Sequence, residues 1–132
     1  MAVQLTYIGE IERNNAKGIL LQATFTGVYG VNGVGDLLNL APYELGANPG
    51  GILDPKALYN MILGQVPAIP PGILVENIGG SYCQVKPNAA PTMFNYGLQM
   101  FEPGGAEKAT AAAYTAAELA GNITLEVFIP EQ

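Results

Sequence analysis

The sequence lacks several residue types on which enzymes and metal sites commonly depend. Among its 132 residues there is no histidine and no tryptophan, and Ser81 and Cys83 are the only serine and the only cysteine. Histidine is the commonest general base, triad partner and nitrogen ligand of metals, so these chemistries lack their usual residue. A lone cysteine excludes an intrachain disulfide framework. We therefore expect a non-enzymatic protein with no cofactor and no metal.

Charge is also scarce, since only 12% of the residues are charged. Five basic residues against eleven acidic ones give a net charge of −6, so the positive field that nucleic-acid binding requires is missing. No stretch reaches the roughly 18 consecutive apolar residues of a membrane helix. The first fifteen residues have neither the basic region nor the apolar region of a secretory signal. We expect no nucleic acid and no membrane as partners, and synthesis in a cytoplasm.

What the chain does contain indicates one β-rich domain, residues 1–132. Apolar residues make up 49% of the sequence, while 17 glycines and 10 prolines imply frequent turns. Alternation of apolar and polar residues is typical of half-buried strands, and Gly79-Gly80 is typical of a tight hairpin turn. The pattern predicts about six strands, within residues 3–11, 18–30, 73–77, 81–86, 92–102 and 122–129. Polar residues 12–18 predict the turn between the first two.

Two short stretches favour helix instead. In residues 54–64, Asp54 suits the N-cap, Pro55 the first helical position and Gly64 the position after the last turn. Before the last strand, Thr115 and Glu118 have the spacing of a capping box, which predicts at most a short helix. The expected fold is a small antiparallel β-sandwich or jelly-roll-like barrel, with one short helix and long loops rich in proline and glycine.

The stretch GVYGVNGVGD, residues 27–36, raises the question of a phosphate-binding loop. Such loops need glycines at fixed spacing between a strand and a helix, and a lysine in the P-loop version. Here lysine is absent, and the residues that follow are strand-like. Asn32-Gly33 between two valines is a strong hairpin signal, because both residues tolerate positive φ. We predict a chain reversal at this point.

Few residues remain as candidates for chemistry. Ser81 lies outside any nucleophile-elbow pattern, so we expect it to open a strand, and the alternation around Cys83 indicates a small core residue. A hydrolase that uses two carboxylates stays open as an alternative, because the sequence does not show which acids converge. Its candidate residues are Asp36, Glu44, Asp54, Glu76 and Glu126.

Tyrosines are numerous enough to form a protein interface or a sugar-binding platform. Tyr96 alternates with apolar neighbours and is expected in the core, whereas Tyr43 and Tyr59 are flanked by predicted loops and are candidates for contact. Pro70 and Pro71 lie in a stretch, residues 66–72, whose prolines favour extended backbone.

The order of these patterns resembles the small capsid decoration, or cement, proteins of tailed bacteriophages. A predicted strand pair is followed by Gly35, Asp36 and alternating leucines, then by residues 73–76 turning at Gly79-Gly80 into residues 82–85. A further strand, a loop of small residues and the apolar last strand at residues 119–129 complete the likeness. Residues 46–72 are longer than the corresponding connection, and whether they contact capsid, a sister subunit or the host stays open.

The resemblance implies a virion structural protein of β-sandwich or jelly-roll-like fold. Such proteins are commonly homotrimers that bind the major capsid protein on the outer capsid surface. Because strand edges are natural contact surfaces, we hypothesise that residues 3–8 pair with a neighbouring subunit. Deleting residues 1–9 should then abolish capsid binding or trimerisation but leave a folded core. The alternative is a phage tail or host-recognition module that binds surface glycan. The candidate interface residues are Val3, Leu5, Tyr7, Tyr43, Tyr59, Pro70 and Pro71.

Overall fold

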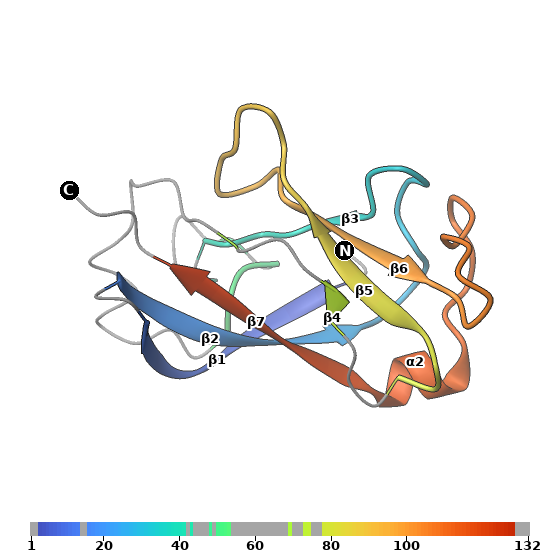
Figure 1. Cartoon of the computed structure of the whole chain (residues 1–132), viewed down its shortest axis with the longest axis horizontal. Helices are drawn as coiled ribbons and strands as arrows, with labels where there is room; N and C mark the ends of the chain where they lie inside the picture. Colours follow the sequence, from blue (N-terminus) through green and yellow to red (C-terminus); the bar gives the residue numbers. More distant parts are fainter. Residues whose placement is uncertain are drawn as a thin grey trace.

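The chain folds into two antiparallel β-sheets that share one hydrophobic core, as a computed structural model shows (Figure 1). The structure describes residues 3–13, 16–41, 43, 48, 50–53, 69, 73–74 and 78–128. Strands β1, β2 and β7 form one sheet in the order β1-β2-β7, and β3 to β6 form the other in the order β3-β6-β5-β4. The predicted mainly β, antiparallel and sandwich-like fold is confirmed.

The three-stranded sheet has the long strands of the molecule. β1 covers Val3–Arg13, β2 covers Ala16–Phe25 and β7 covers Asn122–Phe128. The register of β1 with β2 shifts between Tyr7 and Gly9, so Ile8 lies in a bulge. Both β1 and β2 reach into the polar stretch that predicted a turn at residues 12–18. That turn is therefore shorter than expected, because Glu12 and Arg13 still pair with Lys17 and Ala16.

The four-stranded sheet has two short outer strands around two longer inner ones. β3 covers Asp36–Leu37, β4 Ile73–Leu74, β5 Tyr82–Lys86 and β6 Gly97–Phe101. Gly79 and Gly80 have φ values of 69° and 89°, which L side chains rarely adopt, so the predicted glycine turn before β5 is confirmed. Between the described strands the two sheets pair only within themselves, so the fold is an open sandwich and not a closed barrel.

The core lies where the apolar faces of both sheets meet. The alternation that predicted the strands is reproduced as alternating burial, with Ile123, Leu125 and Val127 of β7 buried. Cys83 and Tyr96 are buried, as predicted for each. The other strand residues of this core are Val3, Leu5, Tyr7, Ile19, Leu21, Ala23, Phe25, Val85, Leu98 and Met100.

Residues 92–102 predicted one long strand, but β6 begins only at Gly97. The backbone N–H of Thr92 donates to the Asn95 side chain at 2.7 Å, and the N–H of Phe94 donates to the Thr92 hydroxyl at 3.1 Å. These local bonds stabilise a turn in place of a ladder, and they leave Phe94 exposed. The predicted strand is therefore wrong over residues 92–96, and Phe94 does not share the burial of Tyr96.

The single described helix, α2 at Ala116–Ala120, confirms the short helix predicted before β7. Thr115 caps it, and the Thr115 and Glu118 side chains form both bonds of the predicted capping box. The helix predicted at residues 54–64 lies outside the described residues, as does most of the extended stretch at residues 66–72.

Candidate functional site

The glycine-rich stretch at residues 27–36 forms a hairpin, which among the described residues is a prominent feature outside the two sheets. The N–H groups of Val34 and Gly35 both donate to the Val31 carbonyl, at 2.9 Å and 2.8 Å. The predicted chain reversal at Asn32-Gly33 is thus present. Only Gly33 of that pair has a positive φ, of 93°, so the turn needs its second central residue to be glycine and not its first. We call residues 27–36 the hairpin segment.

A second stretch, residues 107–114, runs antiparallel beside the hairpin segment, and we call it the loop segment. Val28 pairs with Ala113, the Tyr29 N–H donates to Ala112 at 2.8 Å, and the Ala111 N–H donates to Gly30 at 3.1 Å. Near the tip, the Asn32 side chain donates to the Lys108 carbonyl at 2.9 Å, and its backbone N–H donates to the hydroxyl of Thr110 at 3.0 Å. The two segments together form an irregular ribbon against the core.

Two reciprocal pairs of tyrosine and carboxylate join these segments. The Tyr29 hydroxyl of the hairpin segment donates to Glu107 of the loop segment at 2.6 Å. In the other direction, the Tyr114 hydroxyl of the loop segment donates to the buried carboxylate of Asp36 in the hairpin segment. The two tyrosine rings contact each other edge to face, with centroids 6.4 Å apart. We call this arrangement the tyrosine–carboxylate lock.

Each carboxylate of the lock also accepts a backbone N–H of the hairpin segment. The Gly33 N–H lies 2.9 Å and 2.8 Å from the two Glu107 oxygens, and the Gly30 N–H donates to Asp36. Burial raises the pKa of the Asp36 carboxyl, while the Tyr114 hydroxyl and the Gly30 N–H lower it and offset part of that rise. Burial and the neighbouring carboxylates likewise raise the pKa of both tyrosines, so both stay neutral donors.

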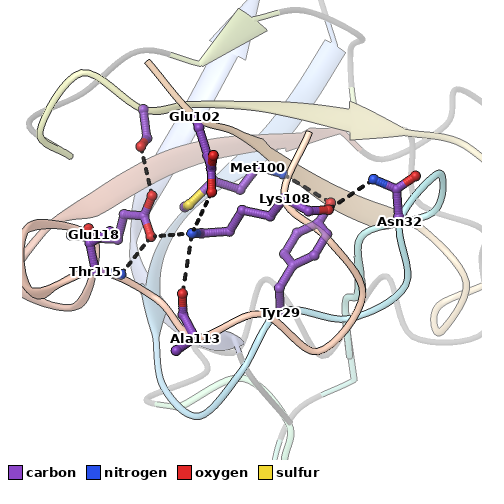
Figure 2. A network of polar contacts seen from close by, with 9 residues as sticks. Tyr29, Asn32, Met100, Glu102, Lys108, Ala113, Thr115 and Glu118 are labelled. Carbon is purple, nitrogen blue, oxygen red and sulfur yellow. Dashed lines mark hydrogen bonds and ion pairs between the residues drawn. The ribbon is translucent and has the colours of Figure 1, made fainter. Parts of the chain in front are cut away.

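A buried ion pair starts from the residue after Glu107, and Figure 2 shows the Lys108 side chain extended towards Glu118. The Lys108 ammonium lies 3.0 Å from Glu118 and 3.5 Å from Glu102, and it donates to the Ala113 carbonyl at 3.3 Å. Lys108 and Glu118 are almost completely buried. The remaining Glu118 oxygen accepts from the hydroxyl of Ser81 at 2.7 Å.

These contacts explain how a carboxylate and an ammonium are accommodated inside a small domain. Burial favours the neutral form of Glu118, but hydrogen bonds from Ser81 and Thr115 and the charge of Lys108 outweigh it and lower the pKa of this carboxyl. Every buried side-chain nitrogen or oxygen among the described residues has a hydrogen-bond partner. A network with all its polar atoms paired serves to fix the loop segment, the hairpin segment and α2 to one another.

Three valines of the hairpin segment expose their side chains to solvent. Val28, Val31 and Val34 are 49%, 54% and 42% exposed. We call these three residues the valine stripe. They recur every third residue, each directly after a glycine, while Tyr29 between them faces the core. Leu37 of β3, the residue after the hairpin segment, is 52% exposed as well.

The predicted interface residues of the N-terminal strand do not present side chains to a partner. Val3, Leu5 and Tyr7 are all buried in the core. The outer edge of β1 is also occupied, because the Leu5 carbonyl and the Tyr7 N–H both bond to the backbone of Leu53, each at 2.9 Å. The Gln4 side chain adds a bond to the Gly51 carbonyl at 2.9 Å.

This placement corrects the deletion hypothesis. Removing residues 1–9 takes three buried side chains out of the core and leaves residues 51–53 without their partner strand, so a folded core is not expected to survive. An intersubunit strand pair at residues 5–7 would first have to displace Leu53.

Of the loop candidates, only Tyr43 falls within the described residues. Its side chain is 39% exposed and its N–H donates to the Ile52 carbonyl at 3.1 Å, so it remains accessible for contact. Tyr59, Pro70 and Pro71 lie outside the described residues. Sequence patterns also missed the groups that matter most here. Lys108 and Glu107 lie in an alanine-rich loop with no motif around them, and only the capping-box spacing marked Glu118.

The described residues that were candidates for chemistry lie in the core, in the lock or in a strand. Cys83 is buried, and burial together with Glu118 and Asp36 raises the pKa of its thiol to about 12, which disfavours the reactive thiolate. Ser81 lies directly before β5 and bonds to Glu118, as its expected place at the start of a strand implies. Of the carboxylates proposed for a hydrolase, Asp36 belongs to the lock and Glu126 to β7. Glu44, Asp54 and Glu76 lie outside the described residues.

Comparisons with known proteins found no match to this chain. No protein-family model matches the chain, and neither a curated protein nor a solved structure matches it significantly. Within the described part of the chain, no cluster of three or more metal-ligating side chains occurs, and no helix is long and apolar enough to cross a membrane.

Proposed function

We propose that this chain is a non-enzymatic cement protein that binds the outer surface of a phage capsid lattice and stabilises it. The observation that carries the proposal is the exposure of four large apolar side chains within ten residues of sequence, those of the valine stripe and of Leu37. Large apolar side chains scattered singly are ordinary on a protein surface, whereas several on one short hairpin favour a contact with another macromolecule.

The hydrogen bonds that hold the hairpin segment are consistent with a docking role. The hairpin segment is bonded along its length to the loop segment and carries no charged side chain between Gly27 and Gly35. A pre-ordered apolar surface loses little conformational entropy on binding, and it has no charge to desolvate. Both properties favour binding to a flat protein lattice.

The proposed partner is the major capsid protein, and the proposed assembly is a homotrimer on the virion exterior. Many copies that each bury a modest apolar area over a seam between capsid subunits stabilise the lattice by mass action and avidity, without any catalytic group. The pattern resemblance to cement proteins supports this assembly. Because Leu53 bonds to the edge of β1 at Leu5 and Tyr7, we propose the contact on the hairpin segment and not on residues 3–8.

Electron microscopy of capsids tests the proposal. Purified protein is added to matched capsids that lack it, and the reconstruction is compared with that of untreated capsids. Saturable extra density on the outer surface at local three-fold positions is the expected result, with light scattering giving a trimer in solution. Binding to host cells or to a glycan array, with no density on capsids, would overturn the proposal in favour of a host-recognition module.

A further inference from the structure

The tip of the hairpin segment contains a dipeptide, Asn32-Gly33, that can undergo a spontaneous covalent change. Asn32 is the only asparagine in the sequence that is followed by glycine. Because glycine has no side chain, nothing on Gly33 hinders its backbone nitrogen from attacking the side-chain carbonyl carbon, Cγ, of Asn32. Both residues are exposed, so water reaches them.

The reaction at this dipeptide exchanges covalent bonds without oxidation or reduction. The Gly33 nitrogen gives up its proton to solvent and forms a bond to Cγ of Asn32. The bond from Cγ to the side-chain nitrogen breaks, and this nitrogen takes up a proton and leaves as ammonia. Water then opens the cyclic imide at either carbonyl, giving aspartate or isoaspartate. Both products carry a negative charge between Val31 and Val34 of the valine stripe.

In the folded chain, hydrogen bonds to the loop segment hold the Asn32 side. The Asn32 side-chain amide donates to the Lys108 carbonyl at 2.9 Å, and the Asn32 N–H donates to the Thr110 hydroxyl at 3.0 Å. Lys108 is itself fixed, because its side chain is buried and paired with Glu118. For Cγ to meet the Gly33 nitrogen, the Asn32 side chain has to leave the Lys108 carbonyl.

The attacking nitrogen is held as well. The Gly33 N–H lies 2.9 Å and 2.8 Å from the two carboxylate oxygens of Glu107. A negative charge this close disfavours loss of the Gly33 proton, because the nitrogen would become an anion beside a carboxylate. The Tyr29 hydroxyl donates to the same carboxylate at 2.6 Å and so keeps Glu107 at the hairpin tip.

We propose that Asn32 is a modification site gated by the loop segment, so that the folded chain preserves Asn32 and release of the loop segment converts it to aspartate or isoaspartate. Loss of contact between the two segments then leaves a permanent negative charge in the valine stripe. The proposal stands on the contacts of Asn32 and Gly33 and does not depend on capsid binding.

Peptide mass mapping over time tests the proposal, because conversion replaces the side-chain amide of Asn32 by a carboxyl. The full chain is incubated at neutral pH, once folded and once unfolded in guanidinium chloride. We expect conversion of Asn32 to be at least about tenfold slower in the folded chain, since hydrogen bonds have to break first. Equal rates in the two states would overturn the proposal.

Variants separate these contacts from the general rigidity of the fold. Glu107→Ala removes the acceptor of the Gly33 N–H, so folded Glu107→Ala should convert Asn32 about threefold faster than folded wild type. Glu12→Ala removes an exposed acid of β1, outside both segments, and should match the wild type.

A rate in Glu107→Ala equal to or below that of the wild type would overturn the gate, because the carboxylate would then be neutral or would act as a base for the Gly33 proton. If Glu107→Ala does not fold, Thr110→Val decides the question by the same comparison, since it removes the acceptor of the Asn32 N–H.

Discussion

At the residue scale, Lys108 is the side chain that best explains how the loops are held. It is a buried ammonium in a loop of small residues, and its carbonyl and its side chain bind the hairpin segment and α2, respectively. Such a pair adds little net stability over a well-packed apolar pair, but removing one partner leaves an uncompensated buried charge. The two segments depend on both charges being present.

Replacing Lys108 by Met should therefore lower the free energy of unfolding by about 3–5 kcal/mol, because Glu118 is left buried and unpaired. Urea denaturation at neutral pH measures the change. The matched control is Lys86→Met, because Lys86 is exposed on β5 and its loss should cost less than about 0.5 kcal/mol. Equal stability of the two variants would contradict the structural role of the Lys108 pair.

The pH dependence of stability should contain a clear contribution from Glu118. Its pKa in the folded state lies below the ordinary value of 4.5, so its stabilising contribution is present above about pH 4.5 and is lost as the pH falls through the folded pKa. The stability difference between wild type and Glu118→Gln should accordingly shrink on acidification. Denaturant titrations at several pH values give this difference, and a constant gap down to about pH 3 would refute the assignment.

Asp36 should act with the opposite sign. Its pKa is raised on folding, so stability is favoured below the unfolded value of 3.8 and decreases as the pH rises through the folded pKa.

The roles of Asp36, Glu107 and Lys108 could not be predicted from the sequence. Asp36 was noted for its place after Gly35 and as one of five candidate carboxylates, but not for its bond to Tyr114. Lys108 and Glu107 have no neighbouring pattern, because the partners that define them lie more than 70 residues away or in another element.

At the scale of elements, prediction succeeded where one face of a strand is buried and the other is exposed. β1, β2, β5 and β7 were found because their alternation is long enough to define a face. The capping box likewise predicted α2. Failure came at residues 92–96, where the Thr92 and Asn95 side chains bind the backbone locally and override the alternation.

The approach of the hairpin segment to β6 also depends on one glycine. A Cβ at Gly97 would overlap the backbone carbonyl of Val34, and neither backbone can give way without breaking the pairing of β3 with β6. Gly97→Ala should cost about 3 kcal/mol or more. The control is Gly104→Ala, where a Cβ meets no atom within 4 Å. Thermal denaturation of both variants checks this, and a similar melting temperature for the two would contradict the close approach.

At the scale of the whole molecule, the sequence predicted the class of fold, but not which surface is available. The N-terminal strand looked like a free edge, yet its side chains belong to the core and residues 51–53 occupy its outer side. Long-range pairing of that kind leaves no local signature. The glycine-rich hairpin was predicted as a turn, while its exposed valines follow only from how the loop segment holds it.

Deletion of residues 1–9 provides a test at this scale. We expect the truncated chain to lose its cooperative thermal transition in circular dichroism, because Val3, Leu5 and Tyr7 leave the core together. A truncated chain that still unfolds cooperatively near the wild-type temperature would show that β1 is dispensable for the fold.

The most direct test of the proposed function is co-sedimentation with capsids that lack the protein. It compares the wild type with two variants in which an exposed apolar residue is replaced by glutamate. Val31→Glu places a charge in the valine stripe, and Leu119→Glu places one at a comparably exposed position on α2. We predict that wild type and Leu119→Glu saturate the capsids, while Val31→Glu binds at least about tenfold more weakly, since a charge must then be desolvated at the contact. Equal binding of all three proteins, or binding by none, would contradict the account.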